Sequence, residues 1–238
     1  MEGRLGGPHR DLSGAWGALT KDPVGVLLPA AALLLIDVAV TTIAPLPTAT
    51  PAFAAAIAIW LALRSVVRTS LRLSMLRAGA RALEEQPQIR WNSWISLWLV
   101  DTVRGTAATA VAAAVFVPTA LMITWLFRHQ LQVLAGLVIA VAALLGLLLW
   151  LIARAIFAPA VSEVILGKGP FRALIDGVTL GKGQFPAIGV LIVAGDLATG
   201  LGGALCGAGA LPGYPITDLA VLHRTLSLHK ERANVPTG

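Results

Sequence analysis

The sequence predicts an all-α protein, a polytopic bundle of about six membrane-spanning helices with interfacial amphipathic helices on the cytoplasmic side. Three observations predict this class. The 238 residues are 57% hydrophobic and only 13% charged, about half the charged fraction of a soluble domain. Several apolar runs reach the roughly 20 residues that a span needs. All but one of the 18 lysines and arginines fall on one side of the bundle that these runs define.

Six apolar segments are the predicted spans. The first four are Val24–Ala44, a segment that starts at Ala52 and includes Arg64, Thr106–Phe127 and Leu131–Ala153. The stretch 185–222 is too long for one span and too rich in glycine for two clean ones, so we split it near residues 200–203 into two short spans. A single span or a re-entrant hairpin is the alternative there. The chain then divides into a cytoplasmic N-terminal segment (1–23), a membrane domain (24–222) and a cytoplasmic tail (223–238).

Three shorter segments are predicted to lie at the cytoplasmic surface, each before a hairpin of two spans: Leu12–Asp22, Arg90–Gly105 and Phe171–Gly183. The second carries tryptophans at spacings of three and four, Trp91, Trp94 and Trp98, and tryptophan favours the membrane–water boundary. We expect this segment to lie in the membrane plane; an aromatic stripe packed in a protein core is the alternative. The order of short segment and hairpin also suggests a weak threefold repeat.

Basic residues set the orientation. Arg64, Arg68 and Arg72 follow an apolar run at helical spacing, so they share one narrow stripe. Their long stems reach the headgroup region, where they bind anionic lipid. Only Arg128 falls on the opposite side, and the positive-inside rule therefore places both termini in the cytoplasm. The sequence predicts a multi-pass protein of the bacterial inner membrane with an even number of spans.

Several function classes lack the residues they need. The net charge of +6 could suggest nucleic acid, but the basic residues sit beside apolar spans, so we expect no nucleic-acid partner. The four histidines have no metal-ligand spacing. No nucleophile motif, phosphate-binding loop or dinucleotide fingerprint is present. We therefore predict no enzyme activity, no metal and no cofactor.

Two acids interrupt predicted spans and are candidate site residues. Asp37 lies about 20 Å and Asp196 about 17 Å from the cytoplasmic starts of their helices, at roughly 1.5 Å per residue. No basic residue is predicted at that depth, so we expect both to lack a cationic partner. They form either a protonatable or cation-binding pair or acids hydrogen-bonded to Thr41, Thr42 or Thr199. The third alternative is that a span boundary lies elsewhere and one of the two acids is at the membrane interface.

Two other patterns predict contacts, one between two helices and one within a single helix. Gly203 and Gly207 are spaced for close packing of one helix on another. Asp101 and Arg104 are three residues apart on one helix, and we expect them to pair locally.

Three stretches resemble the membrane-domain superfamily that includes the integral domain found beside glycerophosphodiester phosphodiesterases and several bacterial six-span families. They are Phe157-Ala158-Pro159-Ala160-Val161, Gly169-Pro170-Phe171-Arg172-Ala173-Leu174 and Leu180-Gly181-Lys182-Gly183-Gln184-Phe185. The tail 218–232 is similar in its basic character, although Leu222-His223-Arg224-Thr225 departs from the family's usual run. The resemblance implies a six-helix fold and no established chemistry.

Two functions are compatible with these features. The first is a non-catalytic integral membrane protein that organises a membrane assembly or the local lipid environment. Its partners would be membrane lipids, with other membrane proteins or further copies of the chain as additional partners. The second is a small proton- or cation-coupled transporter that uses Asp37 and Asp196.

Overall fold

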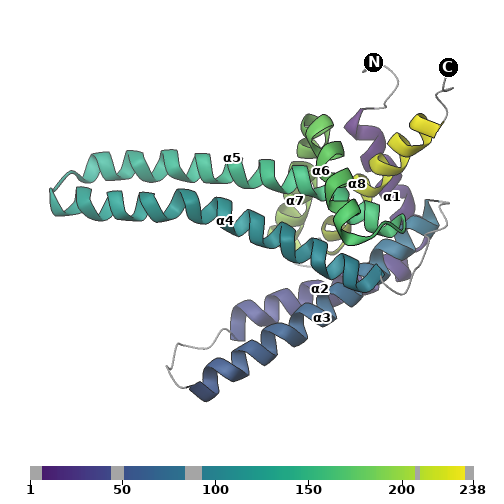
Figure 1. Ribbon diagram of the computed structural model, residues 1–238, viewed down its shortest axis with the longest axis horizontal. Helices are drawn as coiled ribbons and strands as arrows, with labels where there is room; N and C mark the ends of the chain where they lie inside the picture. The colour runs from purple at the N-terminus through teal and green to yellow at the C-terminus, as the bar shows by residue number, and fades with distance from the viewer. Residues whose placement is uncertain (1–6, 44–50, 84–92, 207–209, 234–238) are drawn as a thin grey trace.

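The computed structural model describes residues 7–43, 51–83, 93–206 and 210–233, and this part of the chain is entirely helical apart from short turns. The predicted all-α class is confirmed. The elements are named in chain order in Figure 1: α1 (Pro8–Lys21), α2 (Pro23–Ile43), α3 (Pro51–Ala82), α4 (Ser93–Arg128), α5 (Gln132–Ile165), α6 (Pro170–Gly183), α7 (Phe185–Cys206) and α8 (Ala210–Ala233).

Two of the described helices, α4 and α5, are each long and apolar enough to cross a membrane. They form a hairpin whose outer surface carries large exposed apolar side chains such as Leu121 and Leu144, which is the surface expected to face lipid. The count rises to four if each of the bent pairs α1–α2 and α6–α7 forms one span. The described residues thus show two to four candidate spans, where the sequence predicted six.

The bent pairs share a design. The short helices α1 and α6 each have 14 residues, a glycine N-cap and proline at the first helical position. A sharp bend follows, of 100° into α2 and 94° into α7, close to Pro23 and Pro186. Proline disfavours helical backbone at the residue before it, and Asp22 before Pro23 is not helical. In the second pair the break is at Gln184, two residues before Pro186. This arrangement agrees with a short helix before the first and third hairpins.

The second hairpin differs from the other two. The sequence predicted a separate interfacial helix over Arg90–Gly105, but α4 runs without a break from Ser93 to Arg128. Its first proline is Pro118, and Gly105 alone does not end a helix. The tryptophan-bearing segment is therefore the first part of a long helix.

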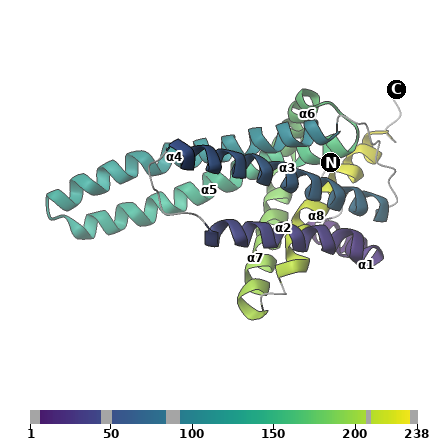
Figure 2. The same ribbon diagram turned by 90° about the horizontal axis from the view of Figure 1, so that it is seen from below.

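The hydrophobic core lies at the end of the molecule where α1, α6 and α8 meet the ends of α3, α4 and α5. Among its largest buried side chains are Met75, Leu76, Leu97, Leu219 and Leu222. From this end the α2–α3 and α4–α5 hairpins project in different directions (Figure 1). Figure 2 shows α7 and α8 packed side by side and directed away from the α4–α5 hairpin.

Helix α8 extends beyond the predicted end of the last span at Leu222. It continues to Ala233, and Arg224 and Thr225 are buried where the sequence predicted the start of a polar tail. The cause is α1, which packs along α8 and supplies a buried carboxylate, Asp11, to Arg224 at 2.9 Å. The stretch 185–222 forms parts of two helices, so it is not a single helix.

Ion pairs join the three helical units, α1–α3, α4–α5 and α6–α8, into a closed ring. In each case an arginine from the last helix of one unit contacts an aspartate of the next unit: Arg72 with Asp101, Arg154 with Asp196, and Arg224 with Asp11. Each unit is thereby held to both others.

Candidate functional site

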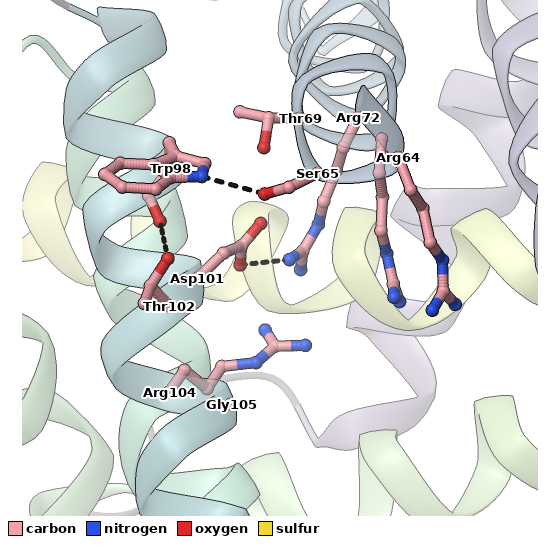
Figure 3. Close-up of a pocket in the computed structure, with 10 residues that line it drawn as sticks. Arg64, Ser65, Thr69, Arg72, Trp98, Asp101, Thr102, Arg104 and Gly105 are labelled. Atoms are coloured by element: carbon pink, nitrogen blue, oxygen red, sulfur yellow. Dashed lines mark hydrogen bonds and ion pairs between the residues drawn. The ribbon is translucent and has the colours of Figure 1, made fainter. Parts of the chain in front are cut away.

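A pocket of about 310 Å³ lies between α3 and α4. The predicted arginine stripe of α3 forms one wall and the first turns of α4 form the other (Figure 3). The pocket is lined by Arg64, Ser65, Arg68, Thr69, Arg72, Trp98, Asp101, Thr102, Arg104 and Gly105. The structure thus gathers four of the candidate residues predicted from the sequence, the three α3 arginines and Trp98.

Arg72 is the anchor of this pocket. It is buried, and its guanidinium forms a salt bridge with Asp101 of α4. It also binds Asp218 of α8 through two hydrogen bonds, Nε to Oδ2 at 2.9 Å and Nη2 to Oδ1 at 2.8 Å. A two-pronged arginine–carboxylate contact fixes geometry as well as charge. Arg72 therefore joins three helices, and its donors are engaged by protein carboxylates.

The tryptophans join α4 to α3. The indole Nε1 of Trp94 donates to Ser70 Oγ at 3.0 Å, and that of Trp98 donates to Ser65 Oγ at 2.8 Å. Both rings are half-buried. Trp91 lies outside the described residues. Trp94 and Trp98 thus hold α4 against α3. Contact of these tryptophans with lipid stays a prediction.

Arg104 projects from α4 into the pocket, with its guanidinium directed toward the α3 arginines (Figure 3). The predicted local pair with Asp101 is wrong, because the Asp101 carboxylate faces Arg72 and bonds to it. Within the part of the chain that the structure describes, Arg104 makes no hydrogen bond or salt bridge. It is a half-buried cation beside a hollow.

The expectation that Asp196 lacks a cationic partner is wrong. Its carboxylate forms a salt bridge with Arg154, whose guanidinium also lies 4.9 Å over the ring of Trp150. The error arose because α5 does not end near Ala153 but continues to Ile165. Arg154 is as far from that end as Asp196 is from the start of α7, so the two residues meet. The side chain of Asp37 lies outside the described residues.

A second charged cluster holds α5, α6 and α8 together. Glu163 is fully buried, and it contacts Lys168 Nζ at 2.7 Å and His229 Nε2 at 2.8 Å. Lys168 also contacts Asp176 at 2.6 Å. Burial disfavours the charged form of Lys168, but hydrogen bonds to Asp176 and Glu163 outweigh this and raise the pKa of its ammonium group. The cluster occupies the junction between two units.

Two glycines of α6 make a close helix contact, whereas the contact predicted for Gly203 and Gly207 stays a prediction. Gly203 is exposed near the end of α7, and Gly207 lies outside the described residues. Gly177 and Gly181 of α6, which have the same spacing of four, pack against α5. A Cβ at Gly181 would lie 2.2 Å from the backbone oxygen of Ile156.

Sequence reasoning missed four polar residues of this region: Ser65, Thr69, Arg104 as a pocket residue, and Asp218. The first two share a helical face with the arginine stripe, so their spacing could have been noticed. Asp218 could not, because 146 residues separate it from Arg72. No arrangement of histidine, cysteine and acidic side chains suited to a metal ion occurs among the described residues.

The chain matches no known protein family, no curated protein and no solved structure. The function is therefore inferred from the pocket itself. Its polar lining consists of guanidinium groups, hydroxyls and one carboxylate, that of Asp101, which Arg72 already engages. Such a lining favours an anion with oxygen acceptors.

Proposed function

We propose that the protein is a non-catalytic integral membrane protein of the bacterial inner membrane that organises the local lipid environment. It holds anionic lipid headgroups in the arginine-lined pocket between α3 and α4. In this proposal the chain crosses the membrane six times with both termini in the cytoplasm, and α1 and α6 lie along the cytoplasmic surface. The proposal also includes membership of the six-helix membrane-domain superfamily that the sequence resembles.

The observation that carries the proposal is the gathering of Arg64, Arg68, Arg72 and Arg104 around one hollow. The pocket lies near the core end of the molecule, and the exposed apolar surface of α4 and α5 extends away from it. Arg128 stands at the far tip of that hairpin. A basic cluster at one end of an apolar hairpin suits an anionic membrane surface, where each basic residue contributes about 1 kcal/mol.

The experiment compares anionic lipid retained by the purified full chain before and after removal of two arginines. Arg64→Gln with Arg68→Gln removes two charges from the pocket while keeping the Arg72 anchor. The matched control is Arg81→Gln with Arg172→Gln, which removes two charges at exposed positions outside the pocket. We expect the pocket variant to retain several-fold less phosphatidylglycerol than the control variant. Equal retention in the two variants would reject the proposal.

The alternative is a proton- or cation-coupled transporter that uses Asp37 and Asp196. The salt bridge between Asp196 and Arg154 favours a structural role for Asp196, because the arginine already balances its charge. The discriminating test is Asp37→Asn and Asp196→Asn in a whole-cell assay. A transporter loses its function in both variants, whereas a lipid-organising protein keeps its wild-type phenotype as long as it folds.

A further inference from the structure

We propose that the α3–α4 pocket recognises a phosphomonoester, a phosphate group with three free oxygens, in preference to the phosphodiester of common anionic lipids. This inference rests on the proposed function and names the ligand class of the same pocket. The juxtaposition behind it is one cation, Arg104, that lines the same pocket as hydroxyl groups and guanidinium groups of the opposite helix.

Arg104 supplies a charge that no hydrogen bond or salt bridge among the described residues holds, although Asp101 and Asp218 attract it at longer range. Within the described residues its guanidinium has no carboxylate partner at salt-bridge distance, whereas Arg72 beside it is held by Asp101 and Asp218. A guanidinium carries five donors in a rigid fork and binds phosphate through two parallel hydrogen bonds. Arg104 is therefore placed to bind an anion without first giving up a contact within the protein.

Hydroxyl groups complete the opposite wall. Ser65 Oγ accepts a hydrogen bond from the Trp98 indole at 2.8 Å, so the hydrogen of this hydroxyl is available to donate into the pocket. Thr69 is 4% exposed and lines the same pocket one turn along α3. Among the described residues that line the pocket, Asp101 is the only one with a carboxylate, and it faces Arg72. Donors thus approach the hollow from both helices.

This arrangement distinguishes two kinds of phosphate. A phosphomonoester carries about −1.5 to −2 charges at pH 7 and three strong acceptor oxygens. A phosphodiester carries one charge, and two of its four oxygens are blocked by ester bonds. A pocket with donors on two facing walls can bond all three free oxygens of the monoester, whereas the diester offers one acceptor oxygen fewer and a smaller charge.

The surroundings fit a lipid as the source of this group. Val66 and Val67 of α3 and Val103 of α4 are all at least 40% exposed, and each is close in sequence to a residue of the pocket. A headgroup in the pocket would place its acyl chains beside these side chains. The phosphate group itself is the shared chemistry, and free phosphate presents the same oxygens.

The experiment measures lipid binding to the detergent-solubilised full chain by native mass spectrometry. Phosphatidic acid supplies the monoester, phosphatidylglycerol with the same acyl chains supplies the diester, and phosphatidylcholine is the uncharged reference. We expect wild type to prefer phosphatidic acid over phosphatidylglycerol by about tenfold or more, which corresponds to about 1.4 kcal/mol. Arg104→Gln should remove this preference while retention of phosphatidylglycerol through the α3 arginines persists. Arg172→Gln, an exposed α6 control, should keep it.

Thr69→Val is the second variant, in case Arg104→Gln fails to fold. It removes one donor at constant shape and should lower the preference about fivefold. Displacement of phosphatidic acid by inorganic phosphate, but not by chloride at equal ionic strength, would support the phosphate group as sufficient. Preference for phosphatidic acid without displacement would support the lipid as the source.

Failures of the two proposals are distinguishable. Equal retention of phosphatidic acid and phosphatidylglycerol by wild type, both above phosphatidylcholine, overturns the monoester inference and leaves the proposed function standing. An unchanged preference in both Arg104→Gln and Thr69→Val also overturns the inference, because the preference then arises elsewhere. Equal retention of all three lipids by wild type overturns the proposed function and the inference together.

Discussion

Arg154 of α5 and Asp196 of α7 form a salt bridge between two of the helical units. Both side chains lie about 17 Å from the core end of their helices, at roughly 1.5 Å per residue. The positive charge of Arg154 also lies over the Trp150 ring, a contact that contributes further attraction. An acid and a base that meet between two largely apolar helices neutralise each other, which lowers the cost of placing either charge there.

Asp196→Asn should destabilise the protein by about 1 kcal/mol, the scale of interhelical polar contacts in membranes. The reason is that Arg154 keeps its charge and loses its carboxylate. The double variant Arg154→Met with Asp196→Leu should recover most of this loss, because no charge is left unpaired. Thermal unfolding in detergent, followed by tryptophan fluorescence, measures both. If the double variant is instead destabilised by the sum of the losses from changing each residue alone, the two residues act independently.

Arg72→Met should cost about 3 kcal/mol, since it leaves the Asp101 and Asp218 carboxylates facing each other without their shared cation. Arg81→Met is the matched control on the same helix, because Arg81 is exposed and its removal should change stability by less than about 0.5 kcal/mol. Chemical or thermal unfolding of the purified variants provides the comparison. If the two variants were equally stable, the salt bridges of Arg72 would make no measurable contribution to the free energy of unfolding.

The sequence predicted the helices and the arginine stripe because both depend on local spacing. Arg154 was missed as the partner of Asp196 because the predicted span ended at Ala153. Hydropathy identifies apolar residues, but it does not show whether lipid or protein covers them. Beyond Ala153 the helix continues through Ala155, Ala158 and Ala160, which are buried against other helices of the protein. Pro159 lies inside α5, which continues through it.

The pocket shows the same limit. Arg64, Arg68 and Arg72 were identified from their spacing, whereas the separate roles of Arg72 and Arg104 depend on where Asp101 points. That direction is set by tertiary packing with α3 and α8. A spacing of four between glycines occurs at 177 and 181 as well as at 203 and 207, and the structure shows the first pair packed on α5. Only packing decides which pair faces a neighbouring helix.

Lys168→Met should destabilise the protein by about 2 kcal/mol, a value below that of a fully buried pair because Lys168 is partly exposed. The pKa of Lys168 is raised in the folded state, so its contribution is fully present below the unfolded pKa near 10.4 and is lost as the pH rises through the folded value. The stability difference between wild type and Lys168→Met should therefore be constant from neutral pH to about pH 10 and shrink above it. Lys182→Met, at an exposed position on α6, is the control. A difference that grows above pH 10 would contradict this account.

Gly181→Ala should destabilise the protein by about 1 to 3 kcal/mol, the usual cost of overpacking. The added Cβ would lie 2.2 Å from the Ile156 carbonyl oxygen, and backbone cannot move aside as a flexible side chain can. Gly183→Ala is a close control on the same helix, because nothing lies within 4 Å of its Cβ position. Since alanine is the better helix former, the control should be as stable as wild type or slightly more so. The two variants change the same atoms two residues apart, so a difference in their unfolding midpoints measures the α5–α6 contact itself. If both variants unfold at the wild-type midpoint, α6 does not pack on α5 as closely as the structure places it.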